Sequence, residues 1–147
     1  MKLIVTKFGG TSVGTIDRIK SVANRIKNEV NNGYNVIVVV SAMAGETNRL
    51  IKLVESLTNN YRTSEYDTVI SSGEQVTSGL LAIALNELGI KSKSYQGWQI
   101  PFETDNNFSK ANIKEIKQDK ILSQISNPSS RNLLPKSVKT LKNMNNF

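Results

Sequence analysis

The sequence contains no cysteine and no histidine among its 147 residues. Without cysteine there is no disulfide framework, which agrees with a cytoplasmic location. Without histidine the chain cannot provide a histidine base, a histidine metal cluster or a Ser–His–Asp triad. Any chemistry must therefore use Lys, Asp, Glu, Ser, Thr and backbone amides. That set favours phosphoryl transfer, in which a protein mainly positions groups and neutralises charge.

Long apolar runs are also absent. No run approaches the roughly 18 residues that a membrane helix needs, and the start "MKLIV" is too quickly polar for a secretion signal. We therefore expect no membrane partner. The length fits one domain or a piece of a larger one, and the 38% hydrophobic content can build a core.

Acidic side chains are scarce toward the end of the chain, where none follows Asp119. The net charge of +7 is therefore concentrated after residue 105. A basic tail can bind nucleic acid, but here only Phe108 and Phe147 could stack on bases. We interpret the tail as a compositional bias toward Asn and Lys, and nucleic-acid binding as the weaker alternative.

Apolar patterns predict strands that alternate with helices. We expect strands at 2–6, 36–40, 65–72 and 90–97, and helices at 15–30, from residue 46, at 73–89 and at 110–126. Residues 98–105 are expected to form an irregular loop. The alternation predicts an α/β fold with a mainly parallel sheet. Loops 7–14 and 41–48 would then lie at the carboxyl ends of strands, where such sheets bind ligands.

The segment "KFGGTSVG" carries the first candidate site. Gly9 and Gly10 allow a sharp turn and let backbone amides approach an anion. A helix that begins just beyond adds a partial positive charge, Lys7 adds a full one, and Thr11 and Ser12 add hydroxyl donors. The pattern favours phosphate binding, although a tight turn with a solvated lysine stays open as the alternative.

Two later segments repeat this kind of chemistry. Ser41 follows a strand, and Thr47 lies at a predicted helix start, so either hydroxyl could bind ligand or merely cap the helix. Glu74 follows Gly73 at the expected start of the helix 73–89. There it could hold a substrate ammonium group or simply complement the helix dipole.

Four ordered motifs resemble the aspartokinases of the amino-acid kinase family. They are "KFGGTSV" at 7–13, "VVVSAMAGETN" at 38–48, "SSGEQVTSGLLAIAL" at 71–85 and "YQGWQIPFETD" at 95–105. The resemblance implies a three-layer α/β/α sandwich with a mainly parallel sheet. It also implies transfer of the γ-phosphoryl group of MgATP to the β-carboxylate of L-aspartate, giving 4-phospho-L-aspartate. That reaction opens lysine, threonine and methionine biosynthesis.

The resemblance also implies roles for the candidate residues. Lys7 would be the catalytic charge on the transferred phosphoryl group, beside the Gly9 and Gly10 amides, and Ser41 would line the phosphate cleft. Thr47 and Glu74 would hold aspartate, with Glu74 binding the ammonium group. Mg²⁺ is expected together with ATP, and no side chain of this chain is assigned as a metal ligand. A carboxylate nucleophile is already ionised at neutral pH and needs no base.

The sequence departs from the family pattern in two places. Residues 106–113, after "ETD", contain no arginine for the substrate α-carboxylate, and Lys110 lacks the bidentate geometry of arginine. The glycine-rich segments that hold the nucleotide in the second half of these kinases are absent. We expect residues 1–126 to be the N-terminal part of a kinase domain, and residues 127–147 to be an unrelated, irregular basic tail.

The missing second half leaves alternatives to a working kinase. The chain could be a truncated, non-catalytic remnant, or one half of a split kinase that a C-terminal half complements. A homodimer is a further expectation. We predict that these 147 residues alone have no measurable kinase activity.

Overall fold

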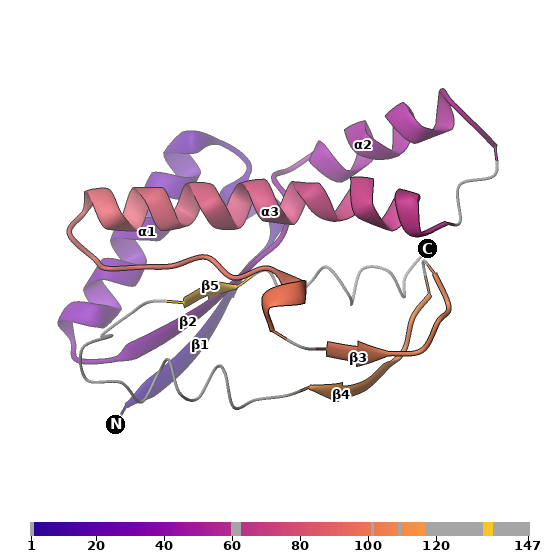
Figure 1. Cartoon of the computed structure of the whole chain (residues 1–147). Helices are drawn as coiled ribbons and strands as arrows, with labels where there is room; N and C mark the ends of the chain where they lie inside the picture. Colours follow the sequence, from indigo (N-terminus) through magenta and orange to yellow (C-terminus); the bar gives the residue numbers. More distant parts are fainter. Residues whose placement is uncertain (1, 60–62, 101, 109, 117–133, 137–147) are drawn as a thin grey trace.

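The structure is a computed structural model that describes residues 2–59, 63–100, 102–108, 110–116 and 134–136 (Figure 1). The strands are β1 (Leu3–Phe8), β2 (Asn35–Val40), β3 (Phe102–Thr104), β4 (Ile113–Ile116) and β5 (Leu134–Lys136). The helices are α1 (Ile16–Asn31), α2 (Glu46–Glu55) and α3 (Ser64–Glu87), with short 3-10 helices at Gly10–Val13 and Gly97–Gln99.

The main sheet is parallel and has the order β1-β2-β5. β1 and β2 pair in register from Leu3 and Asn35 to Phe8 and Val40, so both strands end at the same edge. The β-branched run of β2 suits this central position, because both of its faces meet protein. The predicted parallel sheet is confirmed.

Helices α1 and α3 pack on the same face of this sheet (Figure 1). The core between them contains Phe8, Val13, Ile19, Val22, Ala23, Ile26, Val36, Val38, Val40, Leu81 and Leu85. On the other face, Ile37 contacts a small cluster around Tyr95 and Ile100, whereas Val5 of β1 is 65% exposed. The incomplete α/β architecture is confirmed, and within the described ranges no helix covers this second face.

The first helix forms as predicted. The Thr15 hydroxyl caps α1 by accepting a hydrogen bond from the Arg18 amide at 3.3 Å. Apolar side chains at intervals of three and four then face the core, and Gly33 follows the helix with a positive φ of 86°. The predicted helix at residue 46 is also confirmed as α2.

The predicted strand at 65–72 is wrong, because these residues form the first turns of α3. The hydroxyl of Thr63 accepts a hydrogen bond from the Tyr66 amide, and Glu65 and Asp67 lie in the first turn. These are signals of a helix N-terminus. These signals outweigh the strand preference of the β-branched residues in "DTVISS", because that preference is weak.

The structure differs from three further predictions in the part of the chain that follows α3. Residues 90–96 form no strand, and the expected loop 98–105 contains part of a 3-10 helix and β3. The predicted helix at 110–126 is wrong where it is described, because residues 113–116 form β4, antiparallel to β3. Residues 117–126 lie outside the described part. So does the predicted tail, except Leu134–Lys136, which pair with Ile37–Val39 of β2.

A network around Asp105 explains why residues 102–116 form a hairpin. Its carboxylate accepts hydrogen bonds from the Asn112 side chain at 2.9 Å, the Asn112 amide at 3.1 Å and the Asn107 amide at 3.2 Å. These bonds, chiefly those from Asn112, lower the pKa of Asp105. Because the folded pKa lies below the unfolded one, the stabilisation is present above the unfolded pKa and is lost as the pH falls through the folded pKa.

We therefore expect Asp105→Asn to open the β3–β4 hairpin at neutral pH, and acidification to open the wild-type hairpin. Hydrogen exchange of amides 102–104 and 113–116 measures both effects. Asp17→Asn, which removes an exposed carboxylate from the first turn of α1, is the matched control and should leave these amides protected. Equal protection in Asp105→Asn and wild type at neutral pH would contradict the role of Asp105.

Candidate functional site

The loops that follow β1 and β2 lie against each other. The Ser41 amide donates to the Phe8 carbonyl at 3.2 Å, which extends the pairing of the two strands into the loops. A Cβ atom at Gly10 would lie 2.8 Å from the Ala42 carbonyl oxygen, so only glycine fits this contact without a shift. Both loops follow the carboxyl ends of their parallel strands, as predicted.

The first loop places its polar groups at the surface. Lys7 is exposed at the end of β1, opposite Val39 of β2. Thr11 and Ser12 are exposed on the 3-10 helix that follows, and the Ser12 amide bonds back to the Gly9 carbonyl at 2.9 Å. The 3-10 helix separates the glycines from the long helix α1, which begins at Ile16, close to the predicted start at residue 15.

Ser41 is buried at the start of the second loop. It is 6% exposed, and within the described chain its hydroxyl oxygen has no hydrogen-bond partner. A buried hydroxyl without a partner costs about 1–3 kcal/mol, so a bound oxygen at this position would remove a penalty.

Neither Ser41 nor Thr47 caps a helix. The N-cap of α2 is Gly45, with a φ of 82° and no side-chain capping bond, and Thr47 lies half-buried in the first turn. The capping interpretation of these two hydroxyls is therefore wrong.

Glu74 lies in the interior of α3, not at the start of a helix. The interpretation that it complements a helix dipole is therefore wrong. It is 3% exposed, and its carboxylate accepts a hydrogen bond from the Ala42 amide at 3.2 Å. A buried carboxylate is thus joined to the same loop that carries Ser41, across 32 positions of sequence.

Gly73 is a further residue of this site, and the sequence alone predicts no role for it. A Cβ atom there would lie 2.9 Å from the Ala42 side chain and 3.4 Å from Cγ of Glu46. This contact brings α3 and the start of α2 together beside Glu74. The available signal is a glycine inside a helical pattern, which costs roughly 0.5–1 kcal/mol relative to alanine and suggests close packing.

Gly73→Ala is expected to lower the free energy of unfolding by about 1–3 kcal/mol, because the loop at Ala42 must move. Gly79→Ala, in the same helix but with open space around the new Cβ, should instead raise it by roughly 0.5–1 kcal/mol. Urea denaturation measures both. Equal effects of the two substitutions would show that α3 does not pack closely at Gly73.

Glu46 and Arg49 form an ion pair at the rim of this contact. The guanidinium donates to both carboxylate oxygens, at 2.7 and 2.9 Å. Hydrogen bonding by Arg49 lowers the pKa of Glu46, and Glu46 raises that of Arg49. Because the pair is exposed to solvent, we assign it little weight in stability.

The third and fourth motifs are joined by a polar contact. The side chain of Gln96 donates to the buried Ser78 hydroxyl of α3 at 3.1 Å. Gln96 and Gln99 form a capping box around the 3-10 helix Gly97–Gln99. Burial raises the pKa of the neighbouring Tyr95. This segment therefore supports α3 next to the site.

The described residues contain neither a membrane-spanning helix nor a cluster of metal ligands. None of the helices there is both long and apolar enough to cross a membrane. In the same part of the chain, no three His, Cys, Asp or Glu side chains gather in a way that could hold a metal ion.

Comparisons with known proteins identify relatives of this chain. The Amino acid kinase family matches residues 2–135, which includes part of the expected tail. The aspartokinase of Rickettsia felis is 55% identical over 122 residues, covering 81% of this chain and 30% of its own length. The aspartate kinase of Pseudomonas putida is 48% identical over 121 residues, covering 82% and 29%.

Solved structures give the same result. The aspartate kinase from Synechocystis has a TM-score of 0.78 and 35% identity, covering 92% of this chain and 21% of that one. E. coli aspartokinase III, in complex with aspartate and ADP, has a TM-score of 0.69 at 21% identity, covering 93% and 40%, and so shows the fold alone. The chain spans about 30% of the length of the curated relatives it matches. It belongs to the amino acid kinase family, and its curated relatives are aspartokinases.

Proposed function

We propose that this chain forms the phosphate- and aspartate-binding part of an aspartate kinase. Such an enzyme transfers the γ-phosphoryl group of ATP to the β-carboxylate of L-aspartate. The proposal depends mainly on one observation: Gly10, Ser41 and Glu74 lie close together around the Ala42 backbone. The similar E. coli aspartokinase III is described in complex with aspartate and ADP.

The first loop would bind the phosphate groups. Lys7 would neutralise charge on the transferred phosphoryl group, and the Gly9 and Gly10 amides would donate to its oxygens. The hydroxyls of Thr11 and Ser12 add donors at the surface. Ser41 would donate its unpartnered hydroxyl to a phosphate oxygen, which would satisfy it.

Glu74 and Thr47 would bind aspartate. The Glu74 carboxylate is held in a buried position by the Ala42 amide, so its attraction to a substrate ammonium group is little screened by water. The nucleophilic β-carboxylate is ionised at neutral pH and attacks the phosphorus without a base.

In the proposed enzyme, Mg²⁺ binds together with ATP. In proteins Mg²⁺ is held by one or two carboxylates together with substrate phosphates, so it does not require a metal cluster in the chain. When bound, it neutralises charge on the phosphates.

The length of the chain relative to similar proteins favours a second proposal for its role. The chain spans about 30% of the length of its curated relatives. In addition, Val5 is exposed on the sheet face that no described helix covers. We propose that a C-terminal kinase half completes the enzyme in the cytoplasm. Alone, the chain is expected to bind aspartate without turnover; the remaining alternative is a non-catalytic remnant that binds neither ligand.

Glu74→Gln tests the aspartate site. Glutamine keeps the size and can still accept the Ala42 hydrogen bond, but it loses the charge. We expect L-aspartate affinity, measured by calorimetry, to fall by about 10- to 100-fold, as for a hydrogen bond to a charged group. Glu65→Gln, in the first turn of the same helix, is the control. Unchanged affinity in Glu74→Gln would contradict the assignment.

A further inference from the structure

Arg18 occupies a position in α1 where a cation is unfavourable. It lies in the first turn of the helix, three residues after the N-cap Thr15, where backbone amides without helical partners create a partial positive charge. Acidic residues are favoured in such a turn, and a glutamate in place of Arg18 could complete a capping box with Thr15. Residues that break a local rule of this kind are expected at functional sites.

The guanidinium of Arg18 reaches back to the loop that precedes α1. Its Nη1 atom donates a hydrogen bond to the Thr11 carbonyl, seven positions earlier in the chain. The other end of the same peptide group is also held, because the Ser12 amide donates to the Gly9 carbonyl at 2.9 Å. The peptide group between Thr11 and Ser12 is therefore fixed at both its oxygen and its nitrogen.

This peptide group lies in the loop that would bind phosphate. The 3-10 helix Gly10–Val13 has only four residues, and 3-10 hydrogen bonds have poorer geometry than those of an α-helix. The glycines at its start allow many backbone conformations. A hydrogen bond from a charged donor is stronger than one between neutral groups. The bond from Arg18 therefore selects one conformation of a loop that has few other bonds to define it.

We propose that Arg18 is a positioning residue of the phosphate loop. By holding the Thr11 carbonyl, it fixes the backbone that carries the exposed hydroxyls of Thr11 and Ser12. Among the described residues Arg18 forms no ion pair, so its charge also attracts anions toward the loop. The proposal rests on the phosphate site proposed above, and it assigns no direct contact between Arg18 and the substrate.

Binding of inorganic pyrophosphate to the whole chain tests this role. Calorimetry should show that Arg18→Ala lowers pyrophosphate affinity by about 10-fold, as for the loss of one hydrogen bond from a charged group. Arg18→Lys should lower it only about threefold, because the contact uses a single donor and the charge is kept. The urea midpoint of Arg18→Ala should not fall, since the substitution also removes a cation from the helix N-terminus.

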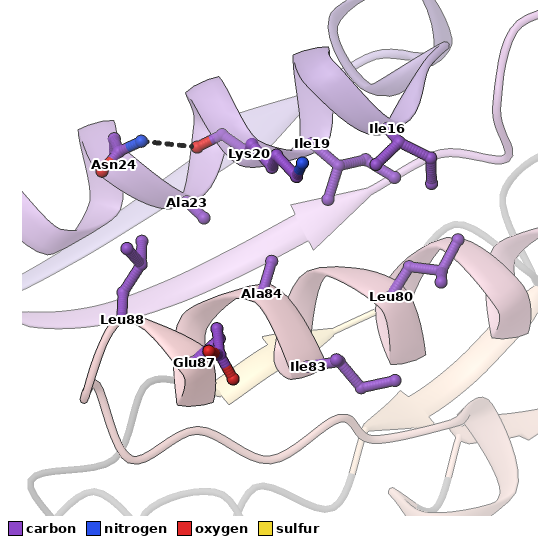
Figure 2. Close-up of a pocket in the computed structure, with 10 residues that line it drawn as sticks. All are labelled: Ile16, Ile19, Lys20, Ala23, Asn24, Leu80, Ile83, Ala84, Glu87 and Leu88. Atoms are coloured by element: carbon purple, nitrogen blue, oxygen red, sulfur yellow. Dashed lines mark hydrogen bonds between the residues drawn. The ribbon is translucent and has the colours of Figure 1, made fainter.

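Two controls separate the loop from general charge effects. Lys20 lies about 200° around α1 from Arg18, beside the groove between α1 and α3 (Figure 2). Lys20→Ala removes the same charge and should leave pyrophosphate affinity within about twofold of the wild type. L-aspartate affinity should also stay within about twofold in Arg18→Ala, because Glu74 is held by the Ala42 amide and not by the first loop.

Hydrogen exchange of the Ser12 amide distinguishes this proposal from the proposed function, because it needs no ligand. We expect this amide to exchange about 10-fold faster in Arg18→Ala than in the wild type, and at the wild-type rate in Lys20→Ala. Unchanged exchange in Arg18→Ala, or unchanged pyrophosphate affinity, would overturn the role of Arg18. Faster exchange in a chain whose wild type binds no pyrophosphate would contradict the phosphate site itself, and the role of Arg18 with it.

Discussion

Lys7→Ala is expected to lower aspartyl phosphate formation by about 10²- to 10³-fold, the usual effect of removing one group that stabilises transition-state charge. The measurement uses a chimera in which the segment of this chain that matches the Rickettsia felis aspartokinase replaces the corresponding part of that enzyme. The chimera is needed because the chain covers only 30% of this relative. Trapping the product with hydroxylamine gives the rate.

Lys2→Ala is the control for this substitution. Lys2 precedes the same strand at its other end, where its ammonium group lies 5.8 Å from the centre of the Tyr34 ring. Its removal takes away the same charge without touching the loop, so the rate should stay within about threefold of the unsubstituted chimera, since distant surface changes have small effects. Equal losses for the two lysines would indicate a general effect of charge and would contradict the role of Lys7.

Gly10→Ala is expected to destabilise the chain by about 1–3 kcal/mol and to weaken ligand binding. The new Cβ atom would lie 2.8 Å from the Ala42 carbonyl oxygen, a backbone atom that can move only with its loop. Since the Ala42 amide also bonds to Glu74, this movement would disturb the aspartate site. Urea denaturation and aspartate calorimetry measure the two effects.

Gly9→Ala is the matched control, because no atom lies within 4 Å of the Cβ position there and its φ of −73° suits alanine. It should change stability by less than about 0.5 kcal/mol, as surface substitutions usually do. If both variants bind aspartate like the wild type, the loops do not meet as described.

The sequence predicts those parts of the fold that depend on local patterns. The β-branched run 36–40 and the apolar spacing of α1 determine β2 and α1 almost by themselves. The β3–β4 hairpin depends on bonds from Asp105 to residues two and seven positions further on, which no periodicity reveals. The composition predicts too late a start for α3, because the capping bond at Thr63 outweighs the strand-like residues that follow it.

The candidate site also has features that the sequence predicts and features that it does not. The parallel-strand rule is sufficient to predict that the loops after β1 and β2 lie together. The burial of Glu74 was not predictable, because it results from a bond to Ala42, a residue 32 positions away in sequence. The contacts of Gly10 and Gly73 with Ala42 are likewise tertiary, and only the glycines themselves indicate them.

The most direct test of the proposed function is product formation by the unsubstituted chimera. We predict that it forms aspartyl hydroxamate only when both ATP and L-aspartate are present, because Lys7, Ser41 and Glu74 then face the remainder of the kinase. A chimera that is folded and binds ATP but forms no product would contradict the proposal that this chain carries the phosphate and aspartate sites of an aspartate kinase.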